Sequence, residues 1–316
     1  MYSRLRYPNL DAKGNAIYVR HRRFVYERLG IDVDDFFRGK VVLDAGCGTG
    51  EETLFLASLG PAKVVGIDTS SGSLEVAWES AVRTGAKNVE FIEASVLDES
   101  VFPNENFDYV SSLGCIHHTP DTHRAFRNLG RMVRPGGHLC TFLYNSYGHF
   151  LYNLQCDALD RWVGNDVDER VRVARRFFDW RWNKTFYREG IPAAYEARMY
   201  DKYGVLYRDS LALKELLGWY SAAGFEHAGS FPMYLRDMLD ATRARDIESR
   251  LPGGFKGRLA GILDRVLPAQ VEPRAWTWKR RTAMQGLLLL MSLYDYGSAF
   301  RILAIKQHGK ESYTQC

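Results

Sequence analysis

A glycine-rich turn after a short apolar run constrains this chain more than any other feature of its sequence. Residues 41–43 read Val-Val-Leu, which is typical of a strand buried on both faces of a sheet. Asp44 ends the run, and glycines then occupy every second position, namely Gly46, Gly48 and Gly50. Apolar residues at helical spacing follow in residues 51–59. The segment predicts a strand, a tight turn and a helix. Open α/β sheets bind nucleotides at such a turn, at the carboxyl end of a strand.

The spacing of the glycines and the acid before them indicate which kind of nucleotide. A dinucleotide site has the spacing Gly-x-Gly-x-x-Gly and directs a helix N-terminus at a diphosphate. Here the spacing is Gly-x-Gly-x-Gly, and Asp44 precedes it. A carboxylate beside the turn suits a ligand with an ammonium group and would repel a diphosphate. In these residues the chain resembles the class I S-adenosylmethionine-dependent methyltransferases, whose first motif is an acid followed by Gly-x-Gly-x-Gly.

The segments after the turn come in the order that this resemblance implies. Residues 63–68 form a second apolar run that ends in Asp68, where an acid can accept hydrogen bonds from both ribose hydroxyls. Further strands are expected at residues 88–94, 107–114 and 138–144, with a helix from about Asp121 to Met132 and a turn at Arg134–Gly137. Strands that alternate with helices predict a parallel sheet covered on both faces. Residues 107–137 are similar to the branch of the family that includes quinone-biosynthesis methyltransferases.

The resemblance implies S-adenosylmethionine as the cofactor and a set of residues that hold it. These are Asp44, Gly46, Cys47, Gly48, Gly50, Asp68, Thr69, Ser95, Val96 and Gly114. Ser95 departs from the family, which usually has an acid there for the exocyclic amine of adenine. A serine still accepts one hydrogen bond but brings no charge, and Asp98 could substitute from one turn later.

Candidate catalytic residues follow the fourth and fifth predicted strands. A methyl sulfonium is already activated, so the protein must hold a nucleophile at attacking distance and remove its proton if it has one. His117 and His118 come after the fourth strand, and Tyr144 and Asn145 close the fifth. A histidine has a suitable pKa for this task, although it could equally hydrogen-bond the backbone at the turn. Asn145 could orient a substrate or cap the end of its strand.

The expected organisation is one Rossmann-like α/β domain with a mostly parallel seven-stranded sheet and a helical cap made by late insertions. Residues 1–37 are expected to form an N-terminal helical lid and residues 38–145 the cofactor-binding core. Residues 146–223 form an insertion rich in aromatic residues and arginine, interpreted as the cap. Residues 224–316 should contain the last two strands, at 224–231 and 299–307, one of them antiparallel as the resemblance implies. A second helical insertion is expected between these strands, at residues 235–295.

Two helices in these flanking regions each allow two interpretations. In the predicted helix at residues 16–29, Tyr18, Arg20 and Arg22 could reach the carboxylate of the cofactor, or the arginines could simply be solvated. Residues 171–182 mix arginines with aromatics, a pattern that can bind single-stranded RNA. We favour an amphipathic helix with its arginines outward, because the charge excess is small. Residues 210–218 predict a further helix capped by Asp209 or Ser210.

Composition limits the classes of function. The chain has 316 residues, a formal net charge of +4 and five scattered cysteines without C-x-x-C spacing, which favours reduced thiols in the cytoplasm. No secretory signal is recognisable, and the longest apolar stretch, residues 286–293, is too short to span a bilayer. No H-E-x-x-H motif or paired C-x-x-C is present, so we expect no metal. We expect neither nucleic-acid binding nor membrane insertion, and the sequence leaves the oligomeric state open.

Three classes of function are compatible with these residues. The favoured one is a methyltransferase that acts on an O, N or C atom of a small molecule, either a metabolite or a natural product. The second is an RNA or protein methyltransferase, although the chain lacks the Asn/Asp-Pro-Pro-Tyr signature after the fourth strand. The third uses S-adenosylmethionine for other chemistry, such as cyclisation or transfer of the aminobutyrate arm with release of methylthioadenosine.

Overall fold

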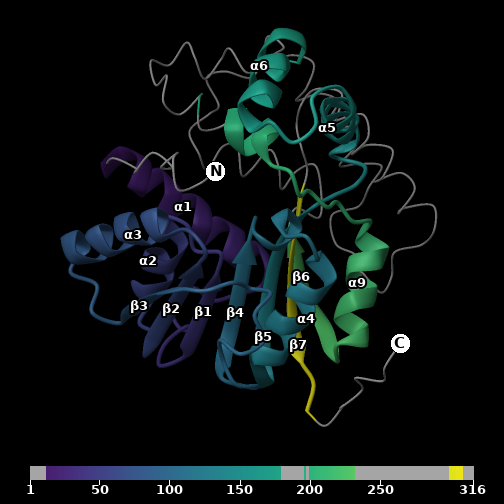
Figure 1. Ribbon diagram of the computed structural model, residues 1–316. Helices are drawn as coiled ribbons and strands as arrows, with labels where there is room; N and C mark the ends of the chain where they lie inside the picture. Colours follow the sequence, from purple (N-terminus) through teal and green to yellow (C-terminus); the bar gives the residue numbers. More distant parts are fainter. Residues whose placement is uncertain (1–11, 179–195, 197–198, 232–298, 309–316) are drawn as a thin grey trace, which may run out of the picture.

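The computed structural model describes residues 12–178, 196, 199–231 and 299–308, and these residues form a seven-stranded sheet (Figure 1). The strand order is β3-β2-β1-β4-β5-β7-β6. The strands are β1 (Val41–Ala45), β2 (Lys63–Asp68), β3 (Val89–Glu93), β4 (Phe107–Leu113), β5 (Val133–Tyr144), β6 (Phe225–Phe231) and β7 (Ala299–Lys306). Strand β7 runs antiparallel to its two neighbours, β5 and β6, and the other pairs of neighbouring strands in the described sheet are parallel. The predicted Rossmann-like, mostly parallel sheet is therefore confirmed.

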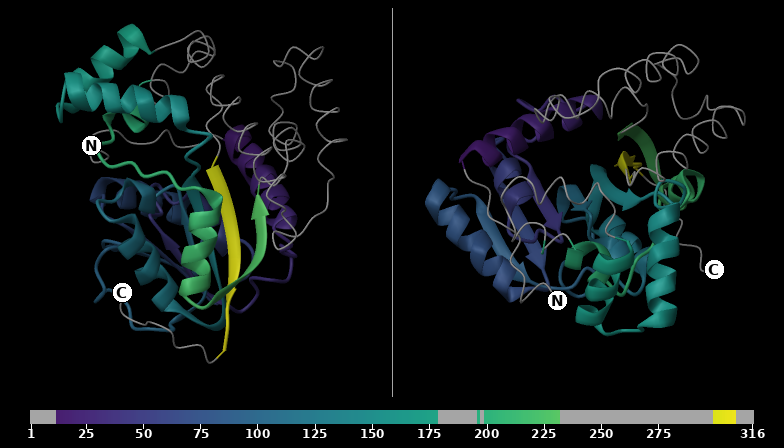
Figure 2. Two further views of the ribbon diagram at one scale, coloured as in Figure 1. Left: turned by 90° about the vertical axis from the view of Figure 1, so that its right-hand side faces the viewer. Right: turned by 90° about the horizontal axis from the view of Figure 1, so that it is seen from above.

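Helices cover both faces of this sheet (Figure 2). In chain order they are α1 (Ala12–Arg28), α2 (Glu51–Ala57), α3 (Ser71–Thr84), the 3₁₀ turn η1 (Ile116–His118), α4 (Thr122–Met132), α5 (Phe150–Trp162), α6 (Val167–Phe177), the π-helical turn η2 (Tyr200–Gly204) and α9 (Leu213–Ala222). Side chains of α1 and α2 pack on one face, and those of α4 and α9 pack on the other. The predicted start of α4 is confirmed, because Asp121 accepts a hydrogen bond from the backbone N–H of Arg124.

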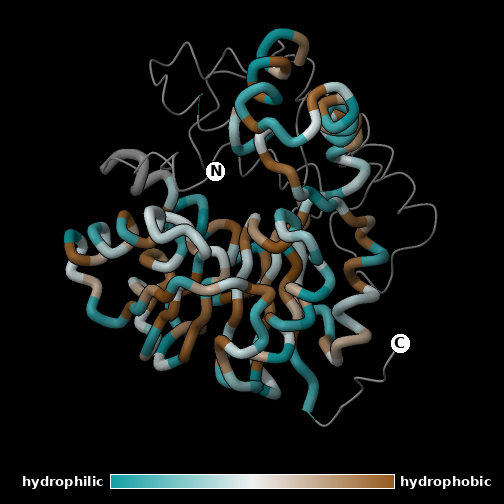
Figure 3. The backbone as a smooth tube through the Cα atoms, viewed as in Figure 1, coloured by the Kyte–Doolittle hydropathy of each residue, from teal (hydrophilic) through white to brown (hydrophobic). Residues whose placement is uncertain are grey.

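The core consists of two layers because successive strand residues point to opposite faces. Val42 and Tyr109 pack with Phe55 of α2 on one side, whereas Leu43 and Val110 pack into the other layer. Figure 3 shows the central strands as predominantly hydrophobic, which is expected of strands buried on both faces. This packing fixes where the strands end, and the loops beyond those ends carry the candidate site.

Two local predictions were wrong. The turn expected at Arg134–Gly137 lies inside the bounds of β5, as an irregularity between the pair Val133–Phe107 and the pair His138–Tyr109. The helix expected from Ser210 is α9, which begins at Leu213 with Ala212 as its N-cap and no side-chain cap. Asp209 and Ser210 have other partners: the N–H of Asp209 donates to the carbonyl of His117, and the hydroxyl of Ser210 accepts from Asn153.

Above the sheet, α5, α6 and η2 form a small helical unit of their own (Figure 1). Its apolar core consists of Tyr152, Cys156, Leu159, Val171, Ala174, Met199 and Tyr203. The amphipathic interpretation of α6 is confirmed, since Val171 and Ala174 are buried and Arg172, Arg175 and Arg176 are exposed. We refer to α5, α6 and η2 as the cap. Helix α9, which ends the range predicted for the cap, packs on the sheet instead.

Some predictions fall outside the described residues. These are the insertion at residues 235–295, the first 11 residues and the end of the aromatic and arginine-rich stretch beyond Phe178. Of the helices in the described ranges, none is long and apolar enough to cross a membrane.

Candidate functional site

The glycine turn is held in place by the end of the neighbouring strand β2. The backbone N–H groups of Gly46 and Cys47 donate to the carbonyl of Ile67 at 2.8 and 2.9 Å. The N–H of Gly48 donates to Oδ2 of Asp68 at 2.9 Å. The φ angles of Gly46, Gly48 and Gly50 are 80°, 54° and 86°, a region that favours glycine. The turn is therefore fixed before any ligand binds.

The three glycines of the turn serve different purposes. A Cβ atom at Gly46 would lie 2.3 Å from the Cβ of Cys115, and one at Gly50 would lie 2.8 Å from the Cβ of Ala77. A Cβ at Gly48 would meet nothing within 4 Å. Gly46 and Gly50 are thus required by close packing inside the protein, and Gly48 is the member of the motif that borders open space. Cys47 is buried, and burial raises the pKa of its thiol, so only its backbone is available to a ligand.

Asp68 has the geometry of an acceptor for two hydroxyl groups. Its Oδ2 accepts from Gly48, and its Oδ1 accepts from the N–H of Ser70 at 2.9 Å. Each carboxylate oxygen keeps a second lone pair for a further donor. Thr69, directly after it, is exposed. These residues fit a bound ribose at the end of β2.

Asp44 is buried at the end of β1, with 2% of its surface exposed. It accepts hydrogen bonds from the hydroxyl of Thr53 at 2.7 Å and from that of Ser111 at 3.4 Å. Burial, with the added charge of Glu52, raises the pKa of Asp44 to about 7. A cation placed beside it would favour the charged carboxylate, so the chemistry of this residue fits the ammonium group of the predicted cofactor.

The residues predicted to surround the adenine lie in a turn after β3. The hydroxyl of Ser95 accepts from the N–H of Leu97 at 3.1 Å. Val96 is buried, and its carbonyl accepts from Asn128 at 3.1 Å. Asp98, considered as a substitute for the missing acid, is exposed and accepts both the N–H and the hydroxyl of Ser100.

Three of the four candidate catalytic side chains form one cluster at the ends of β4 and β5. The ring centroid of His117 lies 4.2 Å from that of His118 and 4.0 Å from that of Tyr144. His149, which the sequence left without a role, stacks on the other face of this group, 4.0 Å from Tyr144. Gly114, with a φ of 83°, leads into the cluster from β4. Cys115 follows it and touches the glycine turn, so the cluster adjoins the cofactor residues.

The two histidines differ in what they can do. Nδ1 of His118 lies 3.0 Å from the carbonyl oxygen of Tyr207, which only accepts hydrogen bonds. Nδ1 of the neutral ring must therefore carry the proton, which leaves the lone pair of Nε2 available as a base. His117 is 1% exposed, and within the described chain neither of its ring nitrogens has a hydrogen-bond partner. Burial lowers the pKa of both rings, so both are neutral at neutral pH.

Asn145 has the geometry of a cap. Its Oδ1 accepts from the backbone N–H groups of Tyr147 and Gly148, each at 3.0 Å. Its backbone forms an isolated β-bridge with Leu211. Leu211 belongs to the same segment as Tyr207, whose carbonyl accepts the hydrogen bond of His118. Asn145 therefore shapes the chain between β5 and α5. In the part of the chain with described side chains, no group of three or more His, Cys, Asp or Glu residues could hold a metal ion.

Comparisons with known proteins agree with this geometry. A model of a methyltransferase domain matches residues 42–137. The ubiquinone biosynthesis O-methyltransferase of Aliivibrio fischeri (strain MJ11) is 37% identical over 101 residues, which cover 32% of this chain and 42% of that protein. The sterol 24-C-methyltransferase of Aspergillus fumigatus is 26% identical over 226 residues, covering 69% of this chain and 54% of that protein. The chain spans about half the length of these curated relatives.

Solved structures share the fold. A proposed sarcosine dimethylglycine methyltransferase from Galdieria sulphuraria superposes with a TM-score of 0.50 at 12% identity, covering 92% of this chain and 84% of that one. At this identity the likeness concerns the fold alone. The acid-and-glycine turn, the strand order and the match over residues 42–137 together have one explanation. Residues 42–137 therefore form a methyltransferase domain of the class I S-adenosylmethionine-dependent type.

Proposed function

We propose that this chain is an enzyme that transfers the methyl group of S-adenosylmethionine to a small-molecule acceptor. The observation that supports this proposal most is the position of His118, a neutral histidine whose Nε2 is available as a base. His118 comes three residues after Cys115, which packs against Gly46 of the glycine turn. When bound, the cofactor supplies an activated methyl group on a positively charged sulfur. The protein then has to position the acceptor, accept its proton and exclude water.

In this proposal the residues around the glycine turn hold the cofactor. Asp68 binds the ribose hydroxyls, and Asp44 provides the negative charge that balances the ammonium group. The backbone around Gly48 borders the methionine part, and Ser95 and Val96 border the adenine. The remaining members are Gly46, Cys47, Gly50, Thr69 and Gly114, which shape the surrounding backbone.

His118 is the residue to which we assign proton removal. Its tautomer is fixed by a carbonyl of the segment that follows the cap, so the base is oriented only when that segment is in place. His117 is buried behind it and has two unsatisfied ring nitrogens in the described chain, which suits hydrogen bonding to an acceptor rather than exchange with solvent. Tyr144 lies between His117 and His149 as an aromatic wall.

A small acceptor with an acidic proton is the substrate class that we favour. The relatives named above are called a ubiquinone biosynthesis O-methyltransferase and a sterol C-methyltransferase, and another is called a 27-O-demethylrifamycin SV methyltransferase. A neutral base beside the cofactor suits a hydroxyl group better than a nucleophile that needs no deprotonation. Against an RNA substrate, exposed arginines of α6 already pair with Glu169 and Glu196. The free cysteines at the described positions suit the reducing cytoplasm, where we place the enzyme.

The test is an assay with S-adenosylmethionine that carries a deuterated methyl group and a panel of phenols, quinols and sterols. We expect acceptor-dependent formation of S-adenosylhomocysteine and a product that carries the label. His118→Ala should lose about 10²–10⁴-fold in turnover while the affinity for S-adenosylhomocysteine is kept. His123→Ala, which changes an exposed histidine on α4, is the matched control and should keep its turnover.

Three outcomes would contradict the proposal. Release of methylthioadenosine without any acceptor would show that the enzyme performs other chemistry on the same cofactor. Near-normal turnover of the His118 variant would show that the acceptor needs no base or that another residue supplies it. Labelled RNA or protein in a cell extract, with no labelled small molecule, would assign the enzyme to macromolecular substrates.

A further inference from the structure

Glu52 is a buried carboxylate directly after the glycine turn, in the first turn of α2, and it binds three side chains of α1. The hydroxyl of Tyr18 donates to it at 2.8 Å and that of Tyr26 at 2.6 Å. Nε of Arg22 lies 2.8 Å from the same carboxylate. Residues at positions i, i+4 and i+8 share one face of a helix, so one face of α1 is directed at Glu52. Arg22 therefore forms an ion pair inside the protein. The sequence had also allowed it to reach the carboxylate of the cofactor.

The surroundings of Glu52 keep it negatively charged. Burial alone would raise the pKa of this carboxyl group, but Arg22 and Arg301 hold it below its usual value. Arg301 belongs to β7 and lies over the ring of Tyr26, 5.7 Å from its centroid. Groups from α1 and β7 thus stabilise one buried negative charge of α2, beside the glycine turn.

The negative charge of Glu52 acts on Asp44, the buried acid at the end of β1. Thr53, the residue after Glu52, donates to Asp44, and the negative charge of Glu52 adds to burial in raising the pKa of Asp44. The hydrogen bond from Thr53, the charge of Arg22 and the hydroxyl of Ser111 lower the pKa of Asp44. The titratable and charged groups that face the pair are Arg22, Tyr18 and Tyr26 of α1, Cys47 of the glycine turn, Cys115 after β4, Cys140 of β5 and Arg301 of β7.

We propose that Glu52 is a positioning residue that couples cofactor binding to the N-terminal helix, by holding α1 against the start of α2 and by controlling the charge of Asp44. This inference rests on the proposed cofactor site. Near neutral pH the free protein holds Asp44 partly protonated. An ammonium group placed beside it favours the anion, so binding expels a proton. The cost of that ionisation depends on Glu52, and the position of α1 depends on the same residue.

The experiment is calorimetric titration with S-adenosylhomocysteine, which carries the same ammonium group, in buffers of different ionisation enthalpy. We expect the wild-type protein to release a fraction of a proton per ligand at pH 7, because Asp44 is only partly ionised near its pKa. Release should diminish above pH 8, where Asp44 is already ionised. Asp44→Asn should bind without releasing a proton. Glu52→Gln should release less at pH 7, because loss of its charge lowers the pKa of Asp44.

Hydrogen exchange of α1 provides a second measurement, which separates the coupling from general loss of structure. Glu52→Gln should speed exchange in α1 at least tenfold, while exchange in the strands of the sheet stays as in the wild type. Arg23→Ala, which removes an exposed ion pair with Asp34 on the same helix, is the control and should leave both the proton release and α1 protection unchanged.

The outcomes separate this inference from the function on which it rests. No heat of binding for S-adenosylhomocysteine at any pH would contradict the proposed cofactor site itself. Binding by the wild-type protein with no dependence on the buffer would overturn the coupling while leaving the cofactor site intact, and it requires no variant to fold. Unchanged exchange in α1 of Glu52→Gln would overturn the part assigned to the helix.

Discussion

Single residues in the glycine turn have roles that spacing alone does not reveal. The acid-and-glycine pattern predicted the turn and its location, because φ preferences are local. It did not separate Gly46 from Gly48, since the atom that a side chain at Gly46 would meet belongs to Cys115, far away in the sequence. The same limit applies to Glu52, whose partners lie on α1 and β7. Contacts between distant segments depend on the whole fold.

Alanine at these two glycines should therefore have different effects. Gly48→Ala places a side chain at positive φ in open space and should destabilise the protein by about 1 kcal/mol. Gly46→Ala adds a clash with Cys115 to the same backbone strain and should cost about 2–4 kcal/mol. Chemical denaturation of the two variants measures the difference. Equal stabilities would show that the packing of Gly46 against Cys115 is loose.

The pH dependence of turnover follows from the state of His118. Burial lowers the pKa of this ring below its usual 6.5, and a base must be unprotonated to act. Turnover at saturating substrates should therefore fall with decreasing pH through a midpoint below 6.5 and stay level above it. The profile of kcat between pH 4.5 and 8 tests this. A midpoint clearly above 6.5 would exclude His118 as the base.

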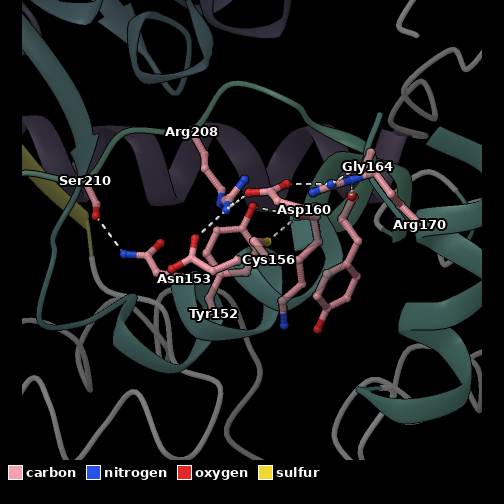
Figure 4. A network of polar contacts seen from close by, with 11 residues as sticks. Tyr152, Asn153, Cys156, Asp160, Gly164, Arg170, Arg208 and Ser210 are labelled. Atoms are coloured by element: carbon pink, nitrogen blue, oxygen red, sulfur yellow. Dashed lines mark hydrogen bonds and ion pairs between the residues drawn. The ribbon is translucent and has the colours of Figure 1, made fainter. Parts of the chain in front are cut away.

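At the scale of elements, the sequence predicted the amphipathic character of α6 but not its buried arginine. Arg170 is fully buried, and Figure 4 shows it joined to Asp160, which Arg208 also contacts. Its Nε donates to the carbonyl of Tyr203 at 3.0 Å, and its Nη1 donates to that of Gly164 at 2.9 Å. An arginine beside exposed arginines gives no signal in the sequence, because its partners come from α5 and η2.

Arg170 should accordingly hold the cap together. Arg170→Ala leaves the carbonyl groups of Tyr203 and Gly164 without this donor and should destabilise the cap by about 2–3 kcal/mol. Arg172→Ala, on the exposed face of the same helix, should change stability by less than about 0.5 kcal/mol. Hydrogen exchange of the backbone amides in α5 and α6 measures the stability of the cap in both variants, and it should be faster in Arg170→Ala. Similar exchange in the two variants would mean that apolar packing alone maintains the cap.

At the scale of the whole molecule, the mostly parallel sheet was predictable because the alternation of strands and helices is regular over residues 38–145. The late strands followed from the family resemblance and were confirmed at β6 and β7. The start of β5 was not predictable, since Arg134–Gly137 has the composition of a turn and lies as an irregularity between two residues that pair with β4, Val133 and His138. There Arg134 forms an ion pair with Asp108 at 2.9 Å.

Asp44 should also make the stability of the whole protein depend on pH. The folded protein holds the proton of Asp44 up to about pH 7, whereas the unfolded chain releases it near pH 4. Between these values the folded state binds more protons, so this residue lowers the free energy of unfolding as pH rises. Asp44→Asn should reduce that loss in urea titrations of the ligand-free protein at pH 5 and 8. An unchanged difference between the two pH values would contradict the assignment.

The most direct test of the account is the affinity for S-adenosylmethionine itself. Calorimetry should show binding by the wild-type protein and no comparable binding of NAD. Asp68→Ala removes the acceptor of the ribose hydroxyls, and loss of a hydrogen bond to a charged group costs about 1.5–3 kcal/mol, so its affinity should fall roughly tenfold or more. Unchanged affinity in the variant would remove Asp68 from the site. Binding of NAD without binding of S-adenosylmethionine would contradict the whole account.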